Sequence, residues 1–179
     1  MIHWLIVLLL SYCFGRWATN QIEGAPAKLN IAALPLPRDW LITVCILLDV
    51  VLYWLYGWGM SWFAGAIMIT YLVSLSWIDY HSMYLPDELT SHLLWIGLFF
   101  NLFQSYSTMH QAILGVIAGY LTLWAIYWIF KLWSDKEGLG LGDAKFFAAI
   151  GAWLGWNALG PVLMVGSIAS LAGIIALVI

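Results

Sequence analysis

The sequence predicts an all-α, polytopic membrane helical bundle with about six to seven transmembrane helices. Two observations carry this prediction. Six basic and nine acidic residues make the chain only 8% charged, and 64% of its residues are apolar. A soluble domain carries about 25% charged residues, since much of its surface must be wettable. Within lipid, each segment must satisfy its own backbone polar groups, so the long apolar runs of this chain favour helices.

Seven apolar runs divide the chain, and a membrane-spanning helix needs about 20 residues, with a range of about 17–25. The second to fifth runs and the seventh run are long enough to cross. The first and sixth runs are short, so either could fail to cross fully. No basic residue precedes the first run, which we therefore interpret as a retained span and not a cleaved signal. The runs are 2–15, 40–58, 62–78, 89–106, 111–133, 144–158 and 162–179.

The internal organisation of the chain is simple. It shows no repeat, low-complexity tract or soluble domain, so we predict a single integral-membrane domain over 1–179. Two pairs of glycines, Gly115/Gly119 and Gly151/Gly155, have the small-xxx-small spacing that lets membrane helices approach closely. We expect close helix packing at these two pairs.

The basic residues predict the topology. Every Lys and Arg lies in one of two segments, 16–38 or 131–145. Four apolar runs separate these segments, so both emerge on the same face, which is cytoplasmic by the positive-inside rule. We expect a bacterial cytoplasmic membrane protein whose N-terminus is outside. The predicted cytoplasmic segments are a short connector, 16–39, and two loops, 79–88 and 134–145.

Composition also excludes several classes of function. Six basic residues and a formal net charge of −3 give no electrostatic footprint for nucleic acid. The two cysteines, Cys13 and Cys45, are far apart and form no CxxC pair, so neither a zinc site nor a disulfide framework is indicated. His81 and His92 flank an acidic segment, but their spacing matches no metal motif. We expect no metal and no cofactor.

Two carboxylates carry the predicted chemistry. Asp79 closes the third run and Asp143 opens the sixth, so both lie at about the same depth, at the cytoplasmic boundary. Two carboxylates that converge on one water cannot both ionise easily, so they share one proton. One of them can then accept a proton from water while the protonated one polarises a scissile carbonyl. This pattern predicts aspartyl proteolysis.

Neighbouring residues suggest supporting roles. Gly140 and Gly142 precede Asp143, and their freedom of backbone conformation would let an extended substrate lie close to the chain. Lys145 either anchors the sixth helix at the interface or tunes Asp143. Asp87 follows Pro86 and reads first as an N-cap of the fourth helix, with a supporting role in the site as the alternative.

Together these residues resemble the bacterial type IV prepilin peptidase family. The resemblance is carried by Ile78-Asp79 followed after six residues by Pro86-Asp87, and then by Gly140-Leu141-Gly142-Asp143-Ala144-Lys145. It covers roughly residues 60–160. It implies that Asp79 and Asp143 are the catalytic pair. It also implies that prepilins or pseudopilins are the substrates, and that their short basic leader is cleaved just after a glycine at the cytoplasmic face.

One departure from the family concerns the segment 16–39. Many members have a larger cytoplasmic segment after the first span, with two CxxC pairs, and also N-methylate the new terminus with S-adenosylmethionine. Here the segment has 24 residues and no cysteine. We therefore transfer no zinc site and expect cleavage without methylation. The expected partners are prepilin-like substrates and membrane lipid.

Two rival functions remain. The GxGD core is shared with preflagellin peptidases and with proteases that cut inside transmembrane segments. The other rival is a small transporter component, whose path would need ionisable residues through the membrane. Asp49 is the one acidic residue deep in an apolar run. The two candidate catalytic residues instead lie at the edges of other runs. That distribution favours an enzyme.

Overall fold

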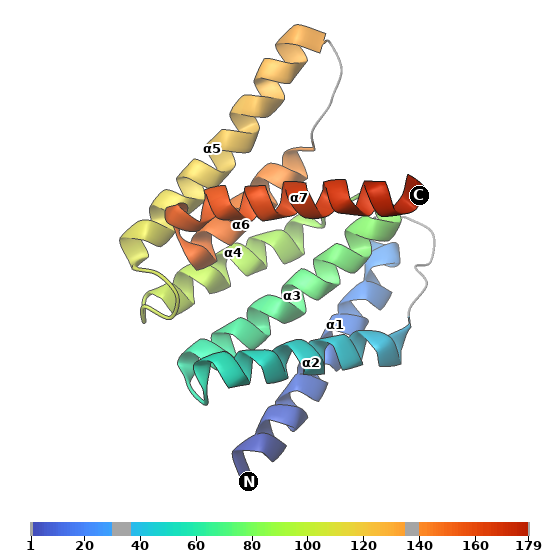
Figure 1. Ribbon diagram of the computed structural model, residues 1–179, viewed down its shortest axis with the longest axis vertical. Coiled ribbons are helices and arrows are strands. Elements are labelled where there is room, and N and C mark those ends of the chain that lie inside the picture. The colour runs from blue at the N-terminus through green and yellow to red at the C-terminus, as the bar shows by residue number, and fades with distance from the viewer. Residues whose placement is uncertain (1, 30–36, 135–139, 179) are drawn as a thin grey trace. The chain divides into compact units, whose positions relative to one another are not determined.

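The computed structural model describes residues 2–29, 37–134 and 140–178. These residues contain seven α-helices, a single-turn 3₁₀ helix and no strand (Figure 1), which confirms the predicted all-α membrane fold. The elements are α1 (Ile2–Leu29), α2 (Arg38–Tyr56), α3 (Met60–Ser82), α4 (Asp87–Asn101), α5 (Met109–Ser134), α6 (Leu141–Leu154), η1 (Trp156–Ala158) and α7 (Leu159–Val178).

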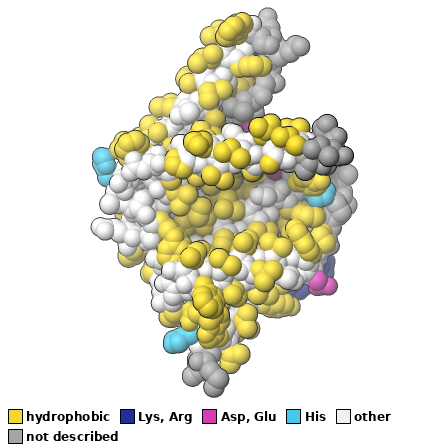
Figure 2. Space-filling model, in the orientation of Figure 1, with side chains coloured by type: hydrophobic (Ala, Val, Ile, Leu, Met, Phe, Trp, Pro, Cys, Tyr) yellow, Lys and Arg dark blue, Asp and Glu magenta, His cyan; other side chains and the backbone are white. Residues whose placement is uncertain are grey.

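Four helical segments of the described chain are long and apolar enough to cross a membrane. They correspond to the second, third, fifth and seventh apolar runs and confirm those predictions. Large apolar side chains on them are exposed, as helices that face lipid require, and Figure 2 shows hydrophobic side chains spread over the visible face with few charged ones. The segments are Arg38–Tyr56, Met60–Ser82, Met109–Trp133 and Trp156–Ile175.

The fourth run is shorter as a helix than predicted. We expected 89–106 to be long enough to cross, but α4 has 15 residues and ends at Asn101. The Asn101 carbonyl oxygen Oδ1 accepts hydrogen bonds from the backbone N–H groups of Tyr106 and Ser107, both at 3.1 Å. These bonds hold the chain in a turn, in which Gln104 has a φ of 54°. The hydropathy of the run could not predict that the Asn101 side chain ends the helix in this way.

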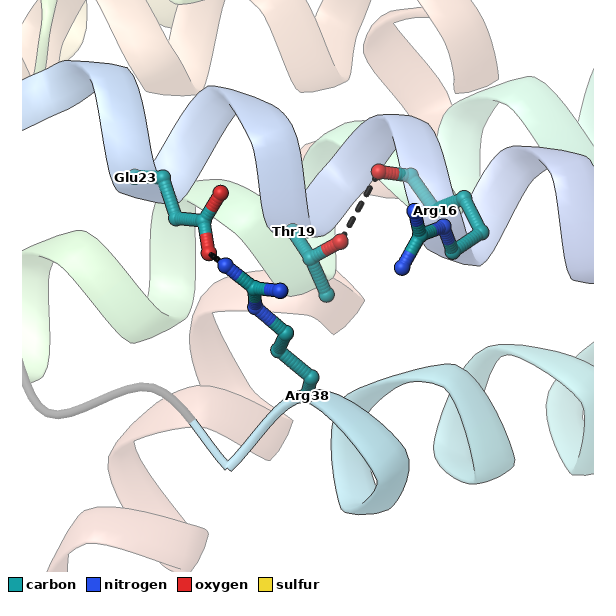
Figure 3. Close-up of polar contacts among 4 residues, drawn as sticks. All are labelled: Arg16, Thr19, Glu23 and Arg38. Carbon is teal, nitrogen blue, oxygen red and sulfur yellow. Dashed lines mark hydrogen bonds and ion pairs between the residues drawn. The ribbon is translucent and has the colours of Figure 1, made fainter.

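The first helix is longer than predicted. Our sequence analysis ended the first run at residue 15 and began a connector at 16, whereas α1 continues to Leu29 with Pro26 inside it. The Thr19 hydroxyl donates to the Arg16 carbonyl at 2.8 Å, and Glu23 forms an ion pair with Arg38 at the start of α2 (Figure 3). The ion pair therefore attaches the later turns of α1 to the start of α2. The rest of the expected connector, 30–36, lies outside the described residues.

The chain divides into two compact units, Met1–Leu93 and Leu94–Ile179, and each is described by itself. In the N-terminal unit, α1, α2 and α3 each pack against the other two. Their core holds Val7, Trp62 and Ala66, all fully or almost fully buried. The prediction of a single domain over 1–179 stays a prediction.

Three hydroxyl groups of helix α3 bind the backbone of their own helix. The Thr70 hydroxyl donates to the Ala66 carbonyl at 2.7 Å, and the Ser74 hydroxyl donates to the Thr70 carbonyl at 2.8 Å. Ser82 makes the same bond, four residues back, to Ile78 at 2.7 Å. Hydroxyl groups in a spanning helix are costly without partners, and here the helix backbone supplies them.

In the C-terminal unit, α5 and α6 pack backbone to backbone. A Cβ atom added to Gly115 would overlap the carbonyl oxygen of Gly151, and the reverse also holds. At Gly119 an added Cβ would lie 2.8 Å from the Phe147 carbonyl oxygen. The predicted close packing at these glycines is confirmed. Gly155 has a further role, since its φ of 78° ends α6 and its N–H donates to the Gly151 carbonyl at 2.9 Å.

Candidate active site

Asp79 lies in the last turn of α3, three residues before the helix ends. Met83 ends the helix in the left-handed conformation, with a φ of 53°, and its N–H donates to the Asp79 carbonyl oxygen at 2.7 Å. His81 is held nearby, where its Nδ1 lies 3.0 Å from the Trp77 carbonyl oxygen. The backbone of Asp79 is therefore fixed, and its half-buried side chain projects from the end of a spanning helix.

Asp143 lies near the N-terminus of a helix, in the first turn of α6, whereas Asp79 lies near the C-terminus of α3. Gly140 is the N-cap, and α6 begins at Leu141, three residues before the apolar run that we identified. The Asp143 N–H donates to the Gly140 carbonyl at 3.2 Å, and a Cβ added to Gly140 would lie 3.5 Å from Asp143 Oδ2. Gly140, and not the acidic Asp143, therefore occupies the N-cap position of α6. The carboxylate instead folds back over the first turn, where the helix dipole favours negative charge.

The two predicted loops are largely helical. Of 79–88, only 83–86 lie between helices, because α3 continues to Ser82 and α4 begins at Asp87. Of 134–145, residues 141–145 belong to α6, and 135–139 lie outside the described residues. Helices α3, α4 and α6 extend beyond the apolar runs into polar residues. Because the loops were predicted from the ends of the apolar runs, these polar residues were assigned to loops.

Asp87 is the first residue of α4 and not its N-cap. The first hydrogen bond of the helix runs from the Thr90 N–H to the Pro86 carbonyl at 3.1 Å, and the Thr90 hydroxyl donates to the same oxygen at 3.0 Å. Pro86 therefore holds the cap position, and the N-cap prediction for Asp87 is wrong by one residue. An acidic residue in the first turn still suits the positive end of the helix.

Lys145 lies two positions after Asp143 in α6 and is half-buried. Residues two apart on a helix do not face each other. The predicted tuning of Asp143 by Lys145 does not follow from their spacing in α6 and stays a prediction. The alternative role of Lys145, as an interfacial anchor, stays a prediction.

A cavity of about 200 Å³ lies in the N-terminal unit, beside the turn between α3 and α4. It is enclosed by one face of α1, the turn, and the first residues of α4. Four of its seven lining residues lie in the predicted loop 79–88. The contribution of α1 was not predicted, because nothing in its sequence indicates that its later turns reach this turn. The lining residues are Gln21, Ala25, Tyr84, Pro86, Asp87, Glu88 and Leu89.

The predicted site residues fall into two groups. Asp79 and Asp87 belong to the N-terminal unit, whereas Gly140, Gly142, Asp143 and Lys145 belong to the C-terminal unit. Within each unit the acidic side chains lie at helix ends next to a turn or a glycine cap. The predicted convergence of Asp79 and Asp143 stays a prediction.

The described residues contain no group of three or more His, Cys, Asp or Glu side chains that could hold a metal ion. Cys13 is exposed and Cys45 is buried, and both are free thiols.

An integral membrane protein with one carboxylate at the end of a spanning helix and another after a Gly-x-Gly cap has the features of the GxGD class of membrane proteases. The match to known families is more specific. The type IV leader peptidase family matches residues 66–178, which include both acidic segments, and the chain belongs to this family.

Individual relatives agree with this assignment. A "Prepilin leader peptidase/N-methyltransferase" of Aeromonas salmonicida (strain A449) is 44% identical over 153 residues, which are 85% of this chain and 50% of the relative. Proteins of the same name from Neisseria gonorrhoeae and Klebsiella pneumoniae are 44% identical over 126 residues and 48% identical over 109 residues. Those two alignments cover 70% and 61% of this chain, and 43% and 48% of the relatives.

The chain thus spans about half the length of the curated relatives that it matches. No solved structure was found to match it.

Proposed function

We propose that this protein is a membrane-embedded aspartic endopeptidase that removes the leader peptide of type IV prepilin-like proteins. The observation that carries the proposal is the placement of Asp79 and Asp143. Each is half-buried at the end of a helix, and both lie within the segment that matches the leader peptidase family. Two relatives that are 44% identical to the chain bear the name "Prepilin leader peptidase/N-methyltransferase".

The proposed chemistry needs both carboxylates. One, ionised, takes a proton from the attacking water, so that the oxygen of this water adds to the scissile carbonyl carbon. The other, protonated, donates a hydrogen bond to the carbonyl oxygen and stabilises the negative charge that develops there. The proton then passes to the leaving amine as the peptide bond breaks. Asp143 is suited to the ionised role because it lies at the positive end of α6.

The cavity beside the α3–α4 turn is the place that we propose for part of the basic leader. Asp87 and Glu88 line it, and it opens just beyond the end of α3, four residues after Asp79. The Arg38 guanidinium would repel a basic leader, but it is paired with Glu23. Gly140 and Gly142 would let extended substrate lie close to the backbone at Asp143.

We place the site at the cytoplasmic face of the bacterial cytoplasmic membrane, with the N-terminus outside. The two segments that hold every Lys and Arg support this topology. Prepilins or pseudopilins are the proposed substrates, and lipid is the proposed surroundings of the exposed apolar helices.

Substitution of each carboxylate tests the proposal. Asp79→Asn and Asp143→Asn should each reduce leader cleavage by about 10⁴-fold or more, since each removes one half of a coupled acid–base pair. The measurement is the rate of cleavage of a prepilin by the purified full-length chain in lipid nanodiscs.

Two further variants are the controls. Asp39→Asn, in the exposed first turn of α2, should cleave at the wild-type rate. Asp87→Asn should retain substantial activity, since its carboxylate is assigned to the first turn of α4 and the cavity wall and not to the chemistry. Cleavage by Asp79→Asn or Asp143→Asn at more than a tenth of the wild-type rate would refute the proposal.

The prediction that the chain cleaves without methylating is tested on the product. It rests on the segment 16–39, which has no cysteine. The mature pilin from cells with this peptidase alone should have a free N-terminal amine by mass spectrometry. A mass increase of one methyl group on its first residue would contradict the prediction and leave the cleavage proposal intact.

A further inference from the structure

Asp49 lies in the middle of α2 at a junction of three helices. It is fully buried, and its main-chain carbonyl accepts a hydrogen bond from Trp62 Nε1 of α3 at 3.1 Å. Its carboxyl group lies beside the hydroxyl of Ser11 in α1, which is also fully buried. A single residue of α2 therefore contacts both of the other helices in the N-terminal unit.

The polar atoms at this junction lack partners. Among the residues that the structure describes, neither carboxylate oxygen of Asp49 nor the Ser11 hydroxyl has a hydrogen-bond partner of normal geometry. A buried polar group without a hydrogen bond costs about 1–3 kcal/mol, and an isolated buried charge costs far more. Three such atoms facing each other point to a ligand that supplies the missing hydrogen bond.

Among the described side chains of α1, α2 and α3, no ion pair with a Lys or Arg is found for an ionised carboxylate at this position. Helix α3 has no Lys or Arg, and the only one in α2 is Arg38 at its start. In α1, Arg16 follows Ser11 by five residues and is exposed. The other titratable side chain beside Asp49 is the buried thiol of Cys45, one turn earlier in α2. The surroundings therefore favour a neutral carboxyl group.

The number of oxygen atoms that Asp49 and Ser11 offer favours a proton over a metal cation as the ligand. A hard metal cation takes about six oxygen ligands, whereas the described side chains here offer three, two of them from one carboxyl group. A proton needs one oxygen and turns the carboxyl into a hydrogen-bond donor. A neutral carboxyl and a hydroxyl each contain a donor and acceptors, so they can satisfy each other.

We propose that Asp49 and Ser11 form a buried proton-binding site that joins α1 to α2 within the membrane. A proton from solvent forms an O–H bond with one Asp49 carboxylate oxygen, and this O–H group donates to Ser11 Oγ. The site is distinct from the candidate active site, because Trp62 and Asp79 are 17 residues apart on α3, or about 25 Å along a helix. It does not rest on the proposed peptidase function.

Infrared spectroscopy of the full-length chain in lipid nanodiscs at neutral pH tests the site. The C=O stretch of a protonated carboxyl group should be present in the wild type, shift in D₂O and be lost in Asp49→Asn. In Ser11→Ala the band should remain but move to higher frequency, because the carboxyl loses its hydrogen-bond partner. Asp49→Asn should fold, since Asn is neutral and has nearly the same shape.

Asp79→Asn distinguishes the two carboxyl sites. A proton shared between Asp79 and Asp143 would give a band that disappears in Asp79→Asn and persists in Asp49→Asn. The band of the proposed site should behave in the opposite way. Identical spectra for wild type and Asp49→Asn would overturn the proposal, and so would an Asp49 band that does not move in Ser11→Ala.

Discussion

Trp62 fills the core between α1, α2 and α3 in the N-terminal unit, whereas in the C-terminal unit the backbones of α5 and α6 meet at Gly115 and Gly151. Around Trp62, the packing is made by side chains, among them Val7 and Ala66. At the glycines, it is made by main-chain atoms. At these two contacts, close helix packing is thus achieved with opposite choices of residue size.

The difference predicts how each unit responds to substitution. Side chains in a core can change rotamer and partly relax around an altered neighbour, so a modest change of shape costs little. Two helix backbones in contact cannot relax without moving apart. In lipid this matters more, because association of helices depends on close van der Waals packing and not on removing apolar surface from water.

The largest expected effect is at the glycine contact. Gly115→Leu or Gly151→Leu should separate α5 from α6, at a cost of about 3 kcal/mol or more, since a side chain must occupy the place of a carbonyl oxygen. The measurement is hydrogen exchange by mass spectrometry on the chain in nanodiscs. Exchange should rise in α5 and α6 and stay unchanged in α1–α3.

Gly166→Leu in α7 is the matched control for this prediction. An added Cβ at Gly166 meets no atom within 4 Å, so exchange should match the wild type. Equal effects of Gly151→Leu and Gly166→Leu would show that the backbone contact does not hold the C-terminal unit together.

The next effect is at Asn101, which ties the end of α4 to the end of α6. Its Nδ2 group donates to the carbonyls of Ala152 and Trp153, both at 2.8 Å, and its Oδ1 accepts from two N–H groups of the following turn. Asn101→Leu leaves these buried groups without partners, so we expect a loss of about 2–3 kcal/mol in unfolding free energy.

Chemical denaturation of the variant in detergent measures this loss. Asn157→Leu, at an exposed position of η1, should change the midpoint little. A midpoint for Asn101→Leu as high as that of the control would show that water replaces the side chain at no cost.

The smallest effect is expected in the N-terminal unit. Trp62→Phe keeps an aromatic ring in the core but removes the hydrogen bond to the Asp49 carbonyl and some volume. We expect a cost of about 1–2 kcal/mol in thermal or chemical unfolding. Trp133→Phe, where the side chain is 89% exposed, should stay within about 0.5 kcal/mol of wild type. A loss for Trp62→Phe larger than that for Gly151→Leu would reverse the comparison between the units.

Sequence alone predicted the features that depend on residue type and spacing. The all-α membrane fold followed from composition, and the close contact at Gly115, Gly119 and Gly151 followed from their spacing. The motifs around Asp79 and Asp143 led to the family that the comparison then showed. Each of these depends on local information that the sequence states directly.

Helix ends were less predictable, because they depend on side-chain bonds that span a turn or join two helices. Asn101 stops α4 by binding the turn that follows, and its partners in α6 lie some 50 residues away in sequence. The ion pair between Glu23 and Arg38 likewise joins α1 to α2. The cavity beside the α3–α4 turn was missed for the same reason, since Gln21 and Tyr84 meet only in the fold.

The hydroxyl groups of α3 have a consequence for how the chain enters the bilayer during synthesis. Thr70, Ser74 and Ser82 each donate to the carbonyl four residues back, so these three hydroxyls enter the lipid already bonded to their own helix. It can leave the translocon as an independent segment and wait for its neighbours. Asp49 has no such partner among the described residues, so the proposed proton site would make the stability of α2 in the bilayer depend on Ser11 of α1. The order of helix assembly is thereby encoded in which polar side chains can satisfy themselves.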